Sequence, residues 1–248
     1  MPTTTPSSQD MILQLQGVHT HIGEYHILQG VDLCVPRGEL TVLLGRNGAG
    51  KTTTLRTIMG LWKASAGSIR FHQKEISQLA TADIANAEIA YVPENMSVFS
   101  DLSVKENLTL AARRPSFDST RLQWIFALFP ALEKFWNTPA GHLSGGQKQM
   151  LSIARALIEP RQLILIDEPT KGLAPAIIQS MISAFQELKN SQTSVLLVEQ
   201  NFNFVRQLGD SVAVLEDGRV VHTGRMCALA EDEELQHKLL GLSLAAHQ

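Results

Sequence analysis

The sequence predicts an α/β fold in which a mostly parallel sheet is covered by helices on both faces. Short apolar runs at 39–44, 163–166 and 194–198 are typical of buried strands. Residues 53–62, 146–158 and 175–189 instead carry apolar positions at helical spacing. Strands that alternate with helices form parallel sheets, because each crossover helix packs on a face of the sheet.

The remaining segments divide the chain further. Residues 11–38 alternate apolar and polar positions, which indicates strands, and 68–71, 89–93 and a pair around the turn at 216–218 are strand-like too. Residues 104–136 repeat apolar positions at helical spacing. We therefore expect a disordered tail at 1–10, one domain at 11–227 with a helical subdomain inserted at about 95–160, and a C-terminal helix at 228–248 to which the sequence assigns no function.

Composition narrows the class of protein. With 44% hydrophobic and 18% charged residues the chain can build a sizeable core, and a net charge of −3 disfavours nucleic acid as a partner. No apolar run approaches the roughly 18 residues of a membrane-spanning helix, and the first ten residues lack the pattern of a signal peptide. These features predict a cytoplasmic protein. Cys34 and Cys227 lie in apolar stretches, which predicts buried, reduced thiols.

A glycine-rich turn follows the first buried strand. Residues 45–52, GRNGAGKT, match the phosphate-loop pattern G-x-x-x-x-G-K-[ST] between a predicted strand and a predicted helix. The glycines let successive N–H groups point at phosphate oxygens, and the helix N-terminus adds partial positive charge. The predicted nucleotide-binding residues are Gly45, Arg46, Asn47, Gly48, Ala49, Gly50, Lys51, Thr52 and Thr53. Lys51 would reach the β- and γ-phosphates, Thr52 would ligate Mg²⁺, and Thr53 would face the α-phosphate.

Two carboxylates end the strand at 163–166. Asp167 and Glu168 follow four apolar residues, so both should emerge at the carboxyl edge of the sheet, where α/β folds bind ligands. Asp167 is placed to hold Mg²⁺ through water. Glu168 is placed to polarise the attacking water as a general base.

A third motif identifies a family resemblance. Residues 143–150, LSGGQKQM, lie between the predicted helical insertion and the acidic strand. This order of motifs resembles that of the ATP-binding-cassette (ABC) ATPases. The resemblance implies a RecA-like P-loop core, an antiparallel β subdomain and a helical signature subdomain. It also implies that the signature caps the γ-phosphate of ATP bound to a partner subunit in a head-to-tail dimer. The signature residues are Leu143, Ser144, Gly145, Gly146 and Gln147.

Four positions depart from the commonest ABC pattern. The aromatic residue that stacks on adenine is expected near Ile22, where Ile22, His21 and Tyr25 are candidates, and we assign Tyr25. Glu94 stands where a glutamine usually approaches Mg²⁺, so the resemblance makes it a metal residue with altered charge. Ala174 replaces a common aspartate that links the subunits. Gln200 replaces the switch histidine, and it can hydrogen-bond a γ-phosphate but cannot carry a proton charge.

The segments YVPE, LSGGQxQM, GLAP and LVEQN resemble the ATPases of importers for branched-chain amino acids, urea or short amides. The resemblance implies ATP hydrolysis with Lys51, Glu168 and Gln200 as catalytic residues, and Mg²⁺ held by Thr52, Glu94 and Asp167. It implies a dimer with a second copy or a sister ATPase, two permeases, and indirectly a periplasmic binding protein. The location would be the inner face of the cell membrane.

Other classes remain to be weighed. Repair ATPases need a long coiled coil, and only 49 residues separate Glu94 from Leu143 (143 − 94). Translation factors of this family carry two cassettes, and P-loop kinases have no use for LSGGQ. A non-hydrolysing regulator is disfavoured because Lys51, Asp167 and Glu168 are present. A non-transport ATPase of a cofactor-assembly machine stays open. Phe99, near the expected permease groove, fits either that groove or the core.

Overall fold

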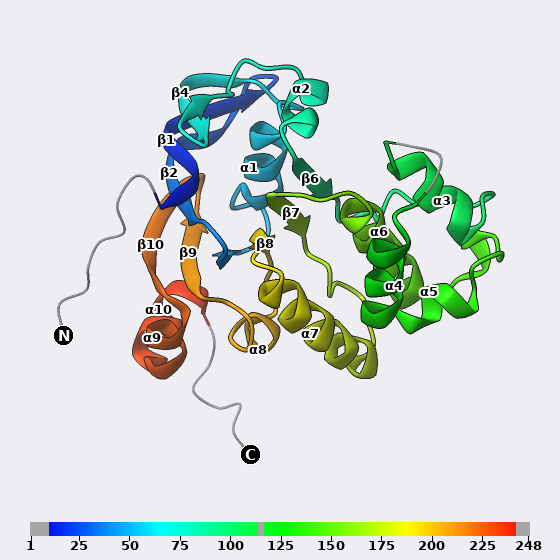
Figure 1. Cartoon of the computed structure of the whole chain (residues 1–248). Helices are drawn as coiled ribbons and strands as arrows, with labels where there is room; N and C mark the ends of the chain where they lie inside the picture. Colours follow the sequence, from blue (N-terminus) through cyan, green and yellow to red (C-terminus); the bar gives the residue numbers. More distant parts are fainter. Residues whose placement is uncertain (1–9, 114–116, 242–248) are drawn as a thin grey trace.

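The computed structural model describes residues 10–113 and 117–241, and it contains two sheets and a lobe of helices (Figure 1). The smaller sheet is antiparallel, in the order β2-β1-β4-β5. The larger has the order β10-β9-β3-β8-β7-β6, and all its pairs are parallel except β9 with β10. The strands are β1 Met11–Ile22, β2 Tyr25–Pro36, β3 Leu40–Leu44, β4 Ala64–Phe71, β5 Lys74–Glu75, β6 Ile89–Val92, β7 Leu163–Asp167, β8 Ser194–Val198, β9 Ser211–Glu216 and β10 Arg219–Arg225. The predicted α/β class is confirmed.

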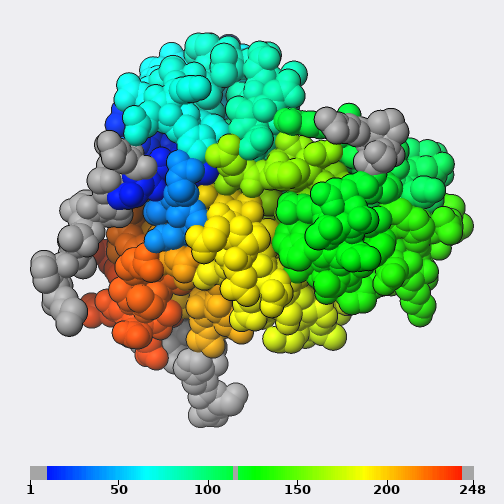
Figure 2. Space-filling view, in the orientation of Figure 1, coloured from blue at the N-terminus to red at the C-terminus, as the bar shows by residue number. Residues whose placement is uncertain are grey.

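Four of the helices form a separate lobe. Helices α3 to α6 form the lobe at one side, which Figure 2 draws in green beside the yellow α7. All four begin and end within residues 95–160. The helices are α1 Lys51–Ile58, α2 Thr81–Asn86, α3 Val104–Ala111, α4 Ser119–Leu128, α5 Pro130–Lys134, α6 Gly145–Leu157, α7 Pro175–Asn190, α8 Phe202–Val205, α9 Met226–Glu231 and α10 Glu233–Leu240. In the described ranges, no helix is long and apolar enough to span a bilayer.

Both faces of the large sheet are buried, which explains the unbroken apolar runs of its strands. Every residue of β3, β7 and β8 is buried. Along β3, Val42 and Leu44 belong to the cluster that includes α6, α7 and the helical lobe. Leu43 belongs to the cluster formed with α1 and the antiparallel sheet. Side chains of a strand alternate between faces, so a strand between two cores has no polar face to show in its sequence.

Two expectations about the ends and the thiols need correction. Cys34 and Cys227 are free and exposed, not buried. Cys34 lies between buried Leu33 and Val35 on β2, so it faces outward by strand alternation. The expected helix at 228–248 is two short helices, because Asp232 ends α9 and its side chain caps α10. Residues 1–9 of the predicted tail and 242–248 lie outside the described residues.

The turn between β9 and β10 ties the phosphate loop to the antiparallel sheet. The Gly218 N–H donates to the carbonyl of Ala49 at 3.0 Å, and its carbonyl accepts from Gln29 N–H at 2.8 Å. Gly218 has φ 74°, and a Cβ there would lie 2.1 Å from the Ile27 carbonyl oxygen. Only glycine fits this turn without displacing β2.

Gly218→Ala is therefore expected to lower the free energy of unfolding by about 2–4 kcal/mol, from backbone strain plus the clash. Gly23→Ala is the matched control, since Gly23 has φ 60° with no atom within 4 Å of a built Cβ. The control should lose only about 1 kcal/mol. Urea unfolding of both variants measures the difference, and equal losses would contradict the proposed clash.

Candidate active site

Three adjacent strands deliver the predicted site residues to one edge of the sheet. β3 pairs with β8, and β8 pairs with β7, all in parallel. Parallel neighbours end on the same side, so the segments that follow them meet there. Residues 45–50 follow β3, Glu168 follows β7, and Gln200 lies two residues after β8.

The phosphate loop has the backbone conformation that its glycines predict. Gly45, Gly48 and Gly50 have φ of 156°, 83° and 104°. Helix α1 begins at Lys51, one residue after this loop. The Lys51 side chain is 5% exposed and turns back over the loop, where its Nζ donates to the carbonyls of Gly45 at 2.9 Å and Arg46 at 3.1 Å. The ammonium group thus lies inside the curl of the loop.

Glu168 points into the same loop. Its Oε1 lies 3.2 Å from Lys51 Nζ and accepts a hydrogen bond from Gln200 Nε2 at 2.6 Å. Gln200 Nε2 also donates to Asn47 Oδ1 at 2.7 Å. Glu168 has φ 44°, the left-handed region that a non-glycine residue seldom occupies. Its N–H donates to the Val198 carbonyl at 2.9 Å, and β8 thereby holds this backbone in place. Strain of this kind concentrates at functional sites.

Asp167 is completely buried behind Glu168. Its Oδ1 accepts from the Thr52 hydroxyl at 3.1 Å and its Oδ2 from the Tyr91 hydroxyl at 3.3 Å. Burial raises the pKa of Asp167, and the negative charges of Glu168 and Glu94 add to the rise. Burial together with the Asp167 charge raises the pKa of Tyr91 to about 12. A hydroxyl beside a buried carboxylate with acidic neighbours suits Mg²⁺, which takes a few protein oxygens and completes its shell with phosphate and water.

Glu94 joins this group through a lysine whose role the sequence did not reveal. Lys171 Nζ lies 2.5 Å from Glu94 Oε1 and 3.7 Å from Glu168 Oε2. Glu94 follows β6 and Lys171 follows β7, the neighbouring strands at this edge.

A second residue missed from the sequence is Glu199, which is 3% exposed. Its Oε1 accepts from the N–H and hydroxyl of Thr170, and its Oε2 accepts from the N–H groups of Gln200 and Asn201. It therefore fastens the loop after β7 to the turn that carries Gln200. A carboxylate directly after four apolar residues was the available signal, the same one that marked Asp167.

The LSGGQ segment lies apart from the phosphate loop, at the start of α6 in the helical lobe (Figure 1). Ser144 caps α6, with its hydroxyl accepting from Gln147 N–H at 3.3 Å and Gln147 Oε1 accepting from Ser144 N–H at 2.8 Å. A Cβ on Gly146 would lie 2.7 Å from Cγ2 of Ile177, near the start of α7. The second glycine of the motif therefore permits close packing on α7.

The three adenine candidates lie where β1 turns into β2. Tyr25 pairs with Ile22 and is 76% exposed. His21 stacks on His26 with ring centroids 4.2 Å apart, and its Nδ1 lies 3.1 Å from the Ser65 hydroxyl. Tyr25 is the candidate whose ring is most exposed.

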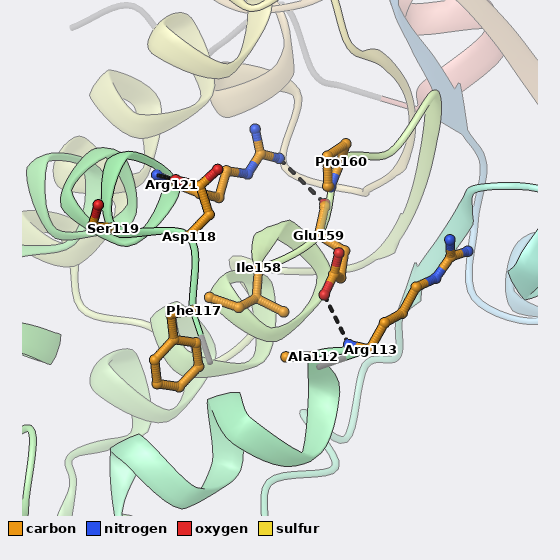
Figure 3. A pocket seen from close by; sticks show the side chains of 9 residues that line it. All are labelled: Ala112, Arg113, Phe117, Asp118, Ser119, Arg121, Ile158, Glu159 and Pro160. Atoms are coloured by element: carbon orange, nitrogen blue, oxygen red, sulfur yellow. Dashed lines mark hydrogen bonds between the residues drawn. The ribbon is translucent and has the colours of Figure 1, made fainter. Parts of the chain in front are cut away.

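The described residues also line cavities away from the phosphate loop. Figure 3 shows one of about 660 Å³ beside the start of α4. Arg121 there donates to the carbonyls of Leu157 at 2.7 Å and Glu159 at 3.4 Å, so it satisfies the carboxyl end of α6. The residues that line it belong to none of the three motifs: Ala112, Arg113, Phe117, Asp118, Ser119, Arg121, Ile158, Glu159 and Pro160.

The other cavity, of about 360 Å³, is a groove between the sheet core and the helical lobe. Its lining is largely apolar and includes two arginines: Met59, Ala85, Ile89, Ala90, Tyr91, Pro93, Met96, Ser97, Ala111, Ser152, Arg155, Ala156 and Arg161. Phe99 is 48% exposed, and the Arg155 guanidinium lies 4.9 Å from its ring centroid. This exposure rules out the core interpretation of Phe99.

Comparisons with known proteins agree with this geometry. A family model described as ABC transporter matches residues 28–171. The chain is 39% identical to the high-affinity branched-chain amino acid transport ATP-binding protein BraG of Pseudomonas aeruginosa, over 93% of this chain and 100% of BraG. It is 33% identical to the probable branched-chain amino acid transport ATP-binding protein LivF of Archaeoglobus fulgidus, over 88% and 94% of the two chains.

Solved structures give the same result. The ADP conformation of MJ1267, an ATP-binding cassette of an ABC transporter, matches with a TM-score of 0.79 and 25% identity, over 94% of this chain and 99% of that one. A dimeric post-hydrolysis state of the cassette MJ0796, bound to ADP and phosphate, matches with a TM-score of 0.76 and 25% identity, over 86% and 98%.

Proposed function

Because this chain belongs to the ABC transporter family, we propose that it is the ATP-hydrolysing subunit of an importer for branched-chain amino acids or related small polar solutes. The observation that carries the proposal is its 39% identity to BraG along the whole of that transport protein. The contact of Lys51, Glu168 and Gln200 at the phosphate loop supports the hydrolytic part.

Nucleotide entry would rearrange the ion pair between Lys51 and Glu168. The β- and γ-phosphates compete for Lys51, whose Nζ already lies within the loop. Once released, Glu168 can accept a proton from a water molecule aligned with the γ-phosphorus. As water attacks, the bond to the bridging oxygen breaks and ADP leaves. Gln200, hydrogen-bonded to both Glu168 and Asn47, would orient the general base and donate to the γ-phosphate.

We assign the adenine contact to Tyr25 because its ring is exposed.

The metal proposal rests on Thr52, Asp167 and Glu94. These residues would hold Mg²⁺, which when bound would offset the negative charge that develops on the phosphates during transfer. Thr52 and Asp167 already share a hydrogen bond, so both oxygens face one point beneath the phosphate loop. Tyr91 holds the second oxygen of Asp167 and fixes its orientation.

The working unit would be a head-to-tail dimer. The LSGGQ segment lies in the helical lobe and the phosphate loop in the core, so in this proposal each signature caps the γ-phosphate of the partner's ATP. The helix N-terminus after Ser144 supplies N–H groups for that contact. The partner would be a second copy or a sister ATPase, and Ala174 removes an aspartate that the family pattern places between subunits.

Two integral-membrane permeases would complete the importer, with a periplasmic binding protein acting through them. We assign their cytoplasmic contact to the groove of Met59, Met96, Ala111 and Arg155, because this groove lies between the lobe and the core and would change if ATP moved one against the other. The chain would then lie on the inner face of the cell membrane as a peripheral subunit.

Affinity purification from gently solubilised native membranes tests the transport proposal. Two multi-span proteins and a second similar ATPase are expected to co-purify with the tagged chain. Ala111→Arg fills the groove and should abolish their recovery while ATP binding persists. Ala127→Arg, at an exposed position on α4, is the matched control. Recovery of soluble partners alone would contradict the importer and favour the cofactor-assembly machine, and uptake assays with amino acids, urea and amides would assign the solute.

A further inference from the structure

Lys171 contacts both acidic residues that flank the buried Asp167. Its Nζ lies 2.5 Å from Glu94 Oε1 and 3.7 Å from Glu168 Oε2. Lys171 is 58% exposed, Glu94 is 41% exposed, and Glu168 is 9% exposed. The lysine therefore bridges an open carboxylate and a largely buried one at the mouth of the site.

The charges around this lysine explain why a cation is needed there. Glu94, Asp167 and Glu168 place three carboxyl groups beside the loop that must accept a polyphosphate. Lys51 lies on one side of Glu168, and Lys171 lies on the other, next to Glu94. A lysine side chain is protonated at neutral pH, so Lys171 brings a positive charge into contact with Glu94 and Glu168. An uncharged residue at 171 would leave Glu94 facing the phosphates without a counterion.

We propose that Lys171 is a positioning residue whose ammonium joins Glu94 and Glu168 and offsets the charge of Glu94, so that nucleotide can bind. This inference rests on the proposed roles of the phosphate loop and of Glu168. It also accounts for a carboxylate at 94, where the family pattern has an amide. The lysine and the carboxylate form a matched pair, contributed by neighbouring loops of the same sheet edge.

The position of the pair couples two parts of the molecule. Glu94 lies in the segment that leads from β6 toward α3 and the helical lobe, and Lys171 lies in the loop that leads from Glu168 to α7. The bridge therefore joins the entry of the lobe to the segment of the general base. A metal ion that attracts Glu94, or a phosphate that attracts Lys171, would open this bridge.

The test measures the Kd for ADP without Mg²⁺ by calorimetry at low and high salt, which needs no turnover. Lys171→Met is expected to weaken binding about three- to fivefold at low salt, less at high salt because exposed charges are screened. Adding Glu94→Gln should restore the affinity to within about twofold of wild type, because the charge balance returns. With Mg²⁺ present the loss should shrink, since the cation replaces part of the missing charge.

Lys189→Met is the matched control. Lys189 forms an ion pair with Asp210 at 2.9 Å, and Asp210 accepts from Leu40 N–H at the opposite end of β3. It should leave the Kd unchanged. Wild-type affinity in Lys171→Met, or a loss that Glu94→Gln does not restore, would overturn the inference. Lys51→Ala in the same assay separates the two proposals: if it too binds normally, the phosphate-loop assignment fails, and if it alone loses binding, only the role of Lys171 fails.

Discussion

Glu168→Gln is expected to bind ATP and hydrolyse it about 10²- to 10⁴-fold more slowly than wild type, the range typical of a lost general base. The amide keeps the size of the side chain but cannot accept the proton of the attacking water. It also removes the negative charge 3.2 Å from Lys51 Nζ, leaving the lysine free for phosphate. Affinity for ATP should therefore hold or rise, and the dimer should accumulate in its closed state.

Single-turnover release of phosphate and size-exclusion chromatography with ATP measure these two effects. Glu187→Gln on the exposed side of α7 is the matched control and should hydrolyse at the wild-type rate. Turnover that survives in Glu168→Gln would mean that another group activates the water. Gln200 would be the first to examine, since its Nε2 reaches both Glu168 and Asn47.

Lys51→Ala is expected to weaken nucleotide binding about 10- to 100-fold, the loss that follows when charged hydrogen bonds to phosphate are removed. Turnover should fall below detection, because Lys51 supplies the ammonium group that lies within the curl of residues 45–50. Lys105→Ala, at an exposed position on α3, is the control and should bind as wild type does.

Equilibrium binding of a fluorescent ATP analogue measures the loss. The variant also leaves Glu168 without its nearer ammonium group, so the free energy of unfolding should be recorded alongside the affinity. Full affinity in a folded Lys51→Ala protein would contradict the assignment of the phosphate loop.

Local pattern was enough to predict the sheet core and the motif-bearing turns. Apart from Thr41, Ser194 and the terminal Asp167, β3, β7 and β8 are apolar, and the phosphate loop needs glycines that few other turns need. The family resemblance added Glu94 and Gln200, which periodicity could not single out. Gln200 does meet Glu168 in space, as a switch residue at that strand end should.

Other contacts depend on which loops the fold brings together, and a linear pattern does not encode that. Lys171 and Glu94 form an ion pair although they are 77 positions apart in the sequence, and no local pattern around either residue predicts it. Cys34 and Cys227 lie in apolar stretches, yet both are exposed. The prediction was wrong because composition does not reveal on which side of a strand or helix a residue lies. The sequence likewise did not predict that the C-terminal helix breaks at Asp232. Acidic residues are favourable both just before a helix and within its first turn, so their presence does not show where the helix begins.

The packing of Gly146 against Ile177 has a mechanical consequence. A methyl group of Ile177 fills the space where a side chain on residue 146 would stand. The first turn of α6 and the first turn of α7 therefore pack directly against each other. In the proposed dimer, a rotation of the helical lobe would then move the start of α7, and with it the loop that runs back to Glu168. In the proposed dimer, the signature serves the partner's nucleotide while that loop serves the chain's own. Each chain would thus connect the two nucleotide sites mechanically through this contact. Release of phosphate at one site would displace the residues around the nucleotide at the other.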